Sequence, residues 1–268
     1  MLEFVKKVEN SKLADNVKYY WRYMYELGKL EIVPYLLEQK AFKVGDKVAE
    51  IGSAEGGVLA AFVEAGATEG LGTDIAQDRL EFGEQIAKIC DVKIEFLYHN
   101  ILTQEINEEW KEKYDLVLLR DVIEHLDDTE LALKNIKKII KKGGKLFVTF
   151  PPYYSPYGGH QHTLANFWGK LPYIHCLPLA IFKFMIKSGR AADILEVKRL
   201  INIKLTTAKF DKAFKSAGFK LSNVDYYLIR PVFRMKFGLT PVKITKLASL
   251  PLVKNIFTLE AAYLLQAD

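Results

Sequence analysis

The sequence predicts an α/β protein with a Rossmann-like, mostly parallel seven-stranded sheet and helices on both faces. Two observations support this fold class. Short apolar segments alternate with helical segments over residues 45–150, and these segments are almost continuously apolar, as strands covered on both faces are. The chain has 268 residues, of which 50% are hydrophobic, so it can form one large core that carries an insertion.

The elements follow in a regular order. The first 40 residues are expected to be helical, because apolar and aromatic residues recur there at helical spacing. Strands are then predicted at 47–51, 70–75, 94–100, 114–120 and 145–150, with helices at 57–66, 77–90 and 129–142. Gly66 and the pair Gly143–Gly144 are expected to end the first and last of these helices.

The alternation stops after residue 150. Residues 151–205 are aromatic, rich in proline and then helical. A helix at 206–217 and two further strands, at 220–228 and 261–266, are expected to complete the sheet. Five strand–helix units followed by two late strands is a distinctive order.

Several features point to a cytoplasmic protein. Cys90 and Cys176 are the two cysteines, which argues against a disulfide scaffold. The first residues, MLEFVKKVEN, are charged from the third position, so no signal peptide is expected. The apolar stretch 171–186 is shorter than a membrane span and contains two prolines and a lysine.

The charge is unevenly distributed along the chain. Up to Gly144 there are 20 Lys and Arg against 27 Asp and Glu, whereas from Lys145 onward there are 18 against 6. The second part therefore carries a balance of +12. This balance suits an anionic partner such as an acidic substrate, a phospholipid surface or nucleic acid, or simply a solvated basic face.

Polar residues stand where the predicted strands end. In a parallel sheet ligands bind beyond these carboxyl ends. A glycine-rich turn, Gly52 to Gly56, follows the first strand, and Asp74 ends the second, at a spacing suited to the hydroxyls of a ribose. Asn100 and Arg120 end the third and fourth strands. These positions describe a pocket for an adenosine-type ligand, either a dinucleotide such as NAD or S-adenosylmethionine.

The sequence resembles the class I S-adenosylmethionine-dependent methyltransferases of small-molecule type. The resemblance rests on Val48-Ala-Glu-Ile-Gly-Ser-Ala-Glu-Gly-Gly57, on Asp74, on the segment from Tyr114 to Leu126 and on Lys142-Gly-Gly-Lys-Leu-Phe-Val-Thr-Phe150. Ala54 replaces the middle glycine of the family's first motif, and Asn100 replaces an aspartate. The Glu124-His125 segment and the two late strands also fit this family better than NAD-binding proteins.

The resemblance implies S-adenosylmethionine as cofactor and assigns its site. The backbone of the glycine-rich turn would approach the methionine part, Asp74 the ribose, and Arg120 the floor beneath the sulfonium. The implied cofactor residues are Glu50, Gly52, Ser53, Ala54, Gly56, Asp74, Ile75, Asn100, Ile101, Arg120, Asp121 and Val122. Arg22 of the N-terminal helix would meet the methionine carboxylate, unless that helix is simply amphipathic. No metal site is expected.

The loop after the fifth predicted strand contains the candidate catalytic groups. It reads Pro151-Pro-Tyr-Tyr-Ser-Pro-Tyr-Gly-Gly-His-Gln-His162. His160 or His162 could accept a proton from an attacking hydroxyl, because imidazole titrates near neutral pH; the alternative is that both pack the loop. The Pro151-Pro152 pair follows Phe150 and the fifth strand, so it does not match the motif of enzymes that methylate amines of DNA bases.

The insertion at 163–205 is more apolar than a solvent-exposed lid requires. It interleaves aromatic and aliphatic residues with lysines and arginines. This composition favours a lipid-like or anionic amphiphilic substrate, with peripheral membrane contact or a dimer interface as further possibilities. A packed cap is the simpler alternative.

Together these features divide the chain into an N-terminal helical segment (1–40), an S-adenosylmethionine-binding core (41–150), a substrate-side insertion (151–205) and the completion of the sheet (206–268). The expected function is methyl transfer to a small or lipid-like acceptor, most readily at an oxygen. An RNA methyltransferase that uses the basic second part, and a non-catalytic S-adenosylmethionine-binding protein, are the alternatives.

Overall fold

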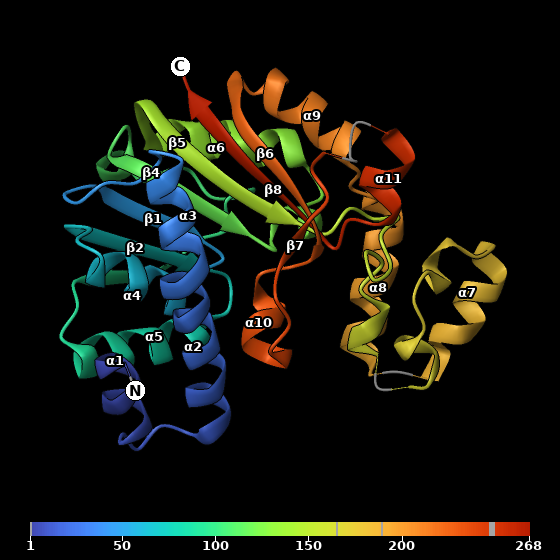
Figure 1. Ribbon diagram of the computed structural model, residues 1–268, viewed down its shortest axis with the longest axis horizontal. Helices are drawn as coiled ribbons and strands as arrows, with labels where there is room; N and C mark the ends of the chain where they lie inside the picture. The colour runs from blue at the N-terminus through green and yellow to red at the C-terminus, as the bar shows by residue number, and fades with distance from the viewer. Residues whose placement is uncertain (1, 165, 189, 247–249) are drawn as a thin grey trace.

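A single mixed sheet forms the centre of the protein (Figure 1). The computed structural model describes residues 2–164, 166–188, 190–246 and 250–268. The strands are β1 (Lys47–Ile51), β2 (Glu69–Asp74), β3 (Ile94–Tyr98), β4 (Tyr114–Arg120), β5 (Ile140–Phe150), β6 (Phe219–Ile229), β7 (Val242–Lys243) and β8 (Glu260–Ala267). They lie in the order β3-β2-β1-β4-β5-β8-β6-β7.

The pairing confirms the predicted fold class. β1 to β5 are parallel to one another. β8 lies between β5 and β6 and is antiparallel to both. The strand order reverses between β1 and β4, where ligands bind in such sheets. The described residues form eight strands rather than seven, because Val242 and Lys243 add a short edge strand to the end of β6.

Helices cover both faces of the sheet. The helices of the described chain are α1 (Glu3–Glu9), α2 (Asp15–Leu27), the π-helix η1 (Gly28–Ile32), α3 (Val33–Glu38), α4 (Gly57–Glu64), α5 (Gln77–Cys90), α6 (Thr129–Ile139), α7 (Leu179–Met185), α8 (Ala191–Ile203), α9 (Thr207–Ser216), α10 (Val232–Phe237) and α11 (Pro251–Ile256). Short 3-10 turns lie at Glu108–Trp110 (η2), Ile123–His125 (η3), Gln161–Thr163 (η4), Trp168–Lys170 (η5), Ile174–Cys176 (η6) and Ile186–Ser188 (η7).

Two apolar layers hold these helices against the sheet. Residues of α1 to α5 pack on one face around Val48, Leu116 and Leu118. Residues of α6 and α9 pack on the other face around Val117 and Leu119. Alternate residues of β4 therefore point into opposite layers and are fully buried in both, which explains the continuous apolar runs of the sequence.

The boundary predicted between the helix at 129–142 and the strand after it is wrong. The helix expected at 129–142 ends at Ile139, and β5 begins at Ile140 rather than at Lys145. Ile140 is buried and pairs with Tyr114 before the register of the β4–β5 ladder shifts. Gly143 and Gly144 therefore lie within the extended segment and do not end the helix. Burial of Ile140 against the sheet outweighs the glycine signal.

The N-terminal helices are held close to the core. A Cβ atom added at Gly57 would lie 2.7 Å from the carbonyl oxygen of Trp21 and 2.9 Å from the backbone nitrogen of Tyr25. The absence of a side chain thus allows α2 to rest on the first turn of α4. This contact brings the middle of α2 to the edge of the sheet where β1 ends.

The insertion forms a small lobe of its own. Its apolar residues pack around Phe182, Ile186 and Val197. In Figure 1 α7 stands away from the sheet, whereas α8 lies nearer to it. α8 is tied to the core by Arg199, which pairs with Asp127 at 2.7 Å, and by Glu196, which bonds to His125. None of the described helices is long and apolar enough to cross a membrane.

Candidate cofactor and acceptor site

A pocket of about 480 Å³ opens at the carboxyl ends of β1, β2 and β4. It brings together nearly all of the residues expected to bind the cofactor. Those that line it are Glu50, Gly52, Ser53, Ala54, Asp74, Ile75, Asn100, Ile101, Arg120, Asp121 and Val122. They come from four separate strand ends, so the parallel sheet itself assembles the pocket.

The turn after β1 has the shape that a close backbone approach requires. Gly52 has a φ of 74°, and a Cβ atom there would lie 2.3 Å from the Cγ2 of Val122. Ala54 also adopts a left-handed conformation, with a φ of 49°. Its N–H donates to Asp74 Oδ2 at 2.9 Å. This bond stabilises the left-handed conformation of alanine at a position where glycine would be the usual residue. Gly56 supports the turn from behind, against Phe96, and does not line the pocket.

Asp74 presents a fixed carboxylate to the pocket. Oδ1 accepts from the N–H of Ala76 at 3.0 Å, and Oδ2 accepts from the N–H of Ala54. Each oxygen keeps a further lone pair for a ligand hydroxyl. The neighbouring Ile75 is 63% exposed and lines the pocket, so it offers an apolar surface to a flat ring. This pair suits a ribose and its base.

A buried ion pair closes the floor of the pocket. Arg120 Nη1 lies 3.3 Å from Glu50 Oε1. Within the described ranges, Glu50 Oε2 has no hydrogen-bond partner. Burial raises the pKa of Glu50 to about 7, although Arg120 opposes this shift. The free oxygen is available to a cationic or N–H donor of a ligand.

Asn100 has a partly structural role. Its side-chain oxygen accepts from the N–H of Leu102 at 3.0 Å and so shapes the turn after β3. His99 also lines the pocket. Its ring lies edge-on to Trp110, with 5.1 Å between the ring centroids. Burial lowers the pKa of His99, which keeps the ring neutral.

The structure does not bring Arg22 to the pocket. Its guanidinium bonds to Glu26 at 2.9 Å and to Glu9 at 3.4 Å, outside the pocket. Successive helix residues are about 100° apart, so Tyr20, Tyr23 and Met24 of the same helix face the pocket instead. The aromatic residues from Tyr19 to Tyr23 indicated that this helix borders a site, but the spacing of apolar residues alone did not show which face of the helix points into the pocket.

Arg79 is a pocket residue that could not be predicted from the sequence. It lines the pocket, and its guanidinium stacks 4.1 Å from the centroid of Tyr20. Glu55 fixes it through two bonds, of 3.0 and 2.6 Å. This arrangement places a held cation at the mouth of the pocket, where a ligand carboxylate could meet it. No motif in the sequence marks position 79.

Acidic and histidine side chains gather at the part of the pocket that His125 and Asp121 line. His125 lines the pocket and stacks edge-on against His160, with 4.7 Å between ring centroids. Their Nε2 atoms lie 3.9 and 3.8 Å from Glu124 Oε1. Arg230, which follows β6, bonds to Asp121 at 2.5 Å and to Glu260 at 2.9 Å.

The two candidate catalytic histidines differ in position. His160 is largely buried in this cluster, whereas His162 is exposed and contacts the rings of Tyr157 and His160. Burial, with the neighbouring histidines, lowers the pKa of His160 well below its usual value. Of the two, His160 alone lies beside the groups that line the pocket.

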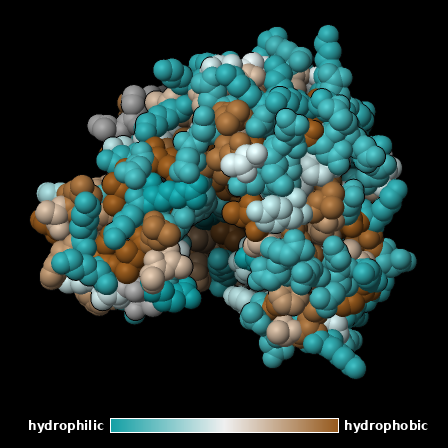
Figure 2. All heavy atoms as spheres, turned by 180° about the vertical axis from the view of Figure 1, so that it is seen from behind, coloured by the Kyte–Doolittle hydropathy of each residue, from teal (hydrophilic) through white to brown (hydrophobic). Residues whose placement is uncertain are grey.

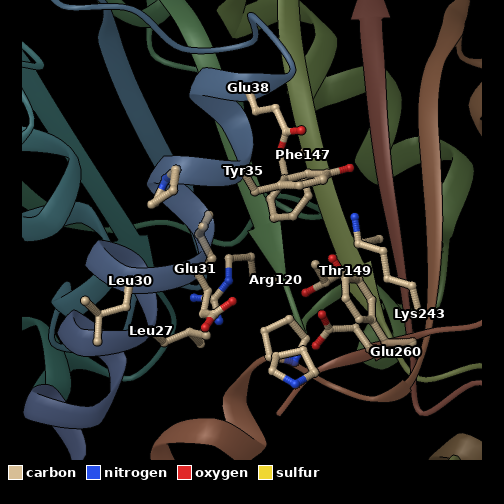
Figure 3. Close-up of a pocket in the computed structure, with 16 residues that line it drawn as sticks. Leu27, Leu30, Glu31, Tyr35, Glu38, Arg120, Phe147, Thr149, Lys243 and Glu260 are labelled. Atoms are coloured by element: carbon tan, nitrogen blue, oxygen red, sulfur yellow. The ribbon is translucent and has the colours of Figure 1, made fainter.

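A second cavity of about 420 Å³ shares Arg120 with the first. Figure 3 shows Arg120, Thr149 and Glu260 around it, with Tyr35 lying over Phe147. The rings of Tyr35 and Phe147 are 5.8 Å apart. Arg120 thus stands between the cofactor-type pocket and a mixed apolar and polar cavity beneath α3.

Comparison with known families agrees with this geometry. Residues 20–223 match the family described as "Methyltransferase domain", which is more than half of the chain. The chain belongs to this methyltransferase family. S-adenosylmethionine is the cofactor of these methyltransferases. The class I resemblance of the sequence is therefore confirmed.

Individual relatives of this methyltransferase are distant. The chain is 24% identical over 147 residues to the ubiquinone biosynthesis O-methyltransferase of Coxiella burnetii, and 28% identical over 151 residues to that of Vibrio atlanticus. Each match covers 53% of this chain and spans 61% of the relative.

Solved structures show the same fold. An S-adenosylmethionine-dependent methyltransferase from Mesorhizobium loti superposes with a TM-score of 0.56 at 14% identity, over 87% of this chain and 96% of that one. The [4+2]-cyclase SpnF superposes with a TM-score of 0.52 at 10% identity, over 88% of this chain and 79% of that one.

The methyltransferase pocket fits S-adenosylmethionine. A Cβ atom at Gly52 would collide with Val122, so the turn requires glycine to pass this close to the end of β4. Glu50 Oε2, which has no hydrogen-bond partner among the described residues, suits a ligand ammonium group. Asp74 and Ile75 suit the ribose and the adenine, and Arg79 suits a carboxylate. The pocket therefore offers a suitable residue for each of four parts of the cofactor: the ammonium group, the carboxylate, the ribose and the adenine.

Asp74→Ala should weaken S-adenosylmethionine binding by roughly 1.5–3 kcal/mol, because charge-assisted hydrogen bonds to the ribose are lost. Isothermal titration calorimetry measures this change. Asp78→Ala, on the exposed first turn of α5, is the matched control and should bind normally. Equal affinity of the folded Asp74→Ala variant and the wild type would refute the ribose assignment.

Glu50→Gln should alter the pH dependence of stability. The pKa of Glu50 is raised from 4.5 to about 7 in the folded state. Between these two values the folded protein binds more protons than the unfolded chain, so the wild type loses stability as the pH rises through them. Between pH 5 and 8 the unfolding free energy of the wild type should fall by about 2–3 kcal/mol relative to that of the variant. Urea unfolding at both pH values tests this, and a pH-independent difference would contradict it.

Proposed function

We propose that this chain transfers a methyl group from S-adenosylmethionine to a small or lipid-like acceptor, at an oxygen. The proposal rests on two groups of residues that adjoin each other at the pocket. The Gly52 turn, Asp74 and Glu50 fit the cofactor, and His125, His160 and Glu124 lie on the adjoining side. Bound S-adenosylmethionine supplies a methyl group on a sulfonium, a good leaving group.

The chain's own task is to orient the acceptor and exclude water. Tyr20, Tyr23 and Met24 of α2 cover one side of the pocket, and Arg230 holds Asp121 in place on the other. His160 is unprotonated at neutral pH, because its pKa is lowered. Its lone pair can therefore accept a proton or bind a cation next to an acceptor hydroxyl.

The relatives support an oxygen nucleophile. The Coxiella and Vibrio proteins are named O-methyltransferases of ubiquinone biosynthesis. Because the chain spans 61% of their length and SpnF shares the fold, the similarity supports the reaction class and does not identify the acceptor.

The lobe supports an amphiphilic acceptor. Phe167 and Phe184 are 67% and 66% exposed. A groove of about 440 Å³ on the lobe is lined by Leu179, Ile186 and Ile194 together with Lys183, Lys187 and Lys198. Figure 2 shows apolar side chains on this lobe, at the left of the view, and a hollow between the lobe and the body of the protein. Apolar walls with a basic rim suit a lipid-like anion or the surface of a membrane.

Turnover assays with a panel of phenols and lipid-like hydroxyl compounds test the proposal through the release of S-adenosylhomocysteine. The wild type should methylate a member of this panel and leave RNA unmodified. His160→Ala should lower kcat by about 10²-fold while S-adenosylmethionine binds with near-normal affinity.

Two results would contradict the proposal. One is methylation of RNA, or of an amine, in preference to every hydroxyl compound. The other is an unchanged kcat in a folded His160→Ala variant, which would remove His160 from the acceptor side of the site.

A further inference from the structure

Three potential ligand side chains converge beside the pocket. One donor atom each from Glu124, His125 and His160 lies within 4.8 Å of the other two. The Nε2 atoms of the two histidines are 3.9 and 3.8 Å from Glu124 Oε1, too far for hydrogen bonds. Three polar groups therefore point toward one small space without bonding to one another.

Glu124 is the second, independent observation. The residue is 3% exposed, and neither of its carboxylate oxygens has a hydrogen-bond partner in the described part of the chain. A buried carboxylate without a partner is costly unless a cation compensates its charge. The neighbouring cation Arg230 is already bonded to Asp121 and Glu260.

His125 is held in the orientation that a metal ligand needs. Its Nδ1 lies 2.5 Å from Glu196 Oε1 on α8. A carboxylate that accepts the Nδ1 proton leaves the lone pair on Nε2, the atom that faces Glu124. Without a cation or a proton between them, this lone pair and the carboxylate would face each other unfavourably. A carboxylate behind a ligating histidine is common at metal sites.

The surrounding charges also favour a cation. Four further carboxylates lie beside these three side chains or beside groups near them: Glu196, Asp121, Glu260 and Asp127. Glu196 bonds to His125, Arg230 pairs with Asp121 and Glu260, and Arg199 pairs with Asp127. Asp121 Oδ1 is also buried without a hydrogen-bond partner among the described residues. Glu124 adds a further acidic group, and neither of these arginines is bonded to it in the described part of the chain.

We propose that Glu124, His125 and His160 bind a divalent transition-metal ion, of the class of Zn²⁺, Fe²⁺ and Co²⁺. Two imidazoles and one carboxylate are a common donor set for these ions, whereas Mg²⁺ prefers oxygen ligands. Ligand atoms lie about 2.0–2.2 Å from such an ion, so the three side chains need to move together by only about 1 Å. No metal was expected from the sequence, where these residues lie in two distant segments.

The site would act on the acceptor. His125 and Asp121 line the pocket, so an ion held by Glu124, His125 and His160 would border the space proposed for the acceptor. A metal ion there would hold an acceptor oxygen and lower the pKa of its hydroxyl. This role rests on the proposed function, whereas the metal site itself stands on the geometry alone.

Metal binding is measured directly on the full chain. After treatment with a chelator, the protein should bind one Co²⁺, with the visible absorption of a low-coordinate site, and Zn²⁺ should displace it. His160→Ala and Glu124→Gln should weaken Zn²⁺ binding by more than about 100-fold, and Glu196→Gln by about 10–100-fold. His162→Ala removes an exposed histidine of the same loop and should bind Zn²⁺ as the wild type does.

S-adenosylhomocysteine binding checks that each variant is folded and separates the two proposals. A wild type that binds S-adenosylhomocysteine but no transition metal overturns this inference and leaves the proposed function standing. Metal binding without S-adenosylhomocysteine binding supports the metal site and overturns the proposed function. Equal Zn²⁺ affinity in the wild type, His160→Ala and Glu196→Gln would also overturn the inference.

Discussion

The pocket depends on the two hydrogen bonds that the Asp74 carboxylate accepts from the backbone. One comes from Ala54, in the turn after β1, and the other from Ala76, in the turn after β2. They tie neighbouring loops together and hold Ala54 in a left-handed conformation. The same carboxylate faces the pocket, so one side chain both shapes the cofactor site and offers acceptors to a ligand.

Buried charges connect the parallel and antiparallel parts of the sheet at this edge. Arg120 ends β4 and pairs with Glu50 of β1. Arg230 follows β6 and joins Asp121, next to β4, to Glu260 at the start of β8. Buried ion pairs of this kind add little net stability, because desolvation offsets the attraction. Their effect here is to fix the relative positions of the ends of β1, β4, β6 and β8 at this edge.

The strands and their ends could be predicted because burial on both faces leaves a strong pattern. β1 and β4 have the predicted bounds, and the residues after them meet at the pocket. The helix face of α2 could not be predicted in the same way, since a small rotation exchanges Arg22 for Tyr23. The end of α6 was missed because packing of Ile140 overrides two glycines.

Long-range groupings were also beyond the sequence. His125 and His160 are 35 positions apart, and Glu196 comes from the inserted lobe. The sequence marked His160 as a candidate base and Glu124-His125 as part of the family resemblance, but it did not bring them together. Their convergence with Glu196 depends on how the loop after β5 and α8 fold back onto η3. Arg79 is a similar case, because its role depends on Glu55 and Tyr20 from other segments.

Calorimetric titration of the wild-type chain with S-adenosylmethionine and S-adenosylhomocysteine, with NAD as control, tests the central claim most directly. The account predicts saturable one-to-one binding of the first two compounds and none of NAD. Binding of NAD alone would contradict the cofactor assignment and leave only the fold.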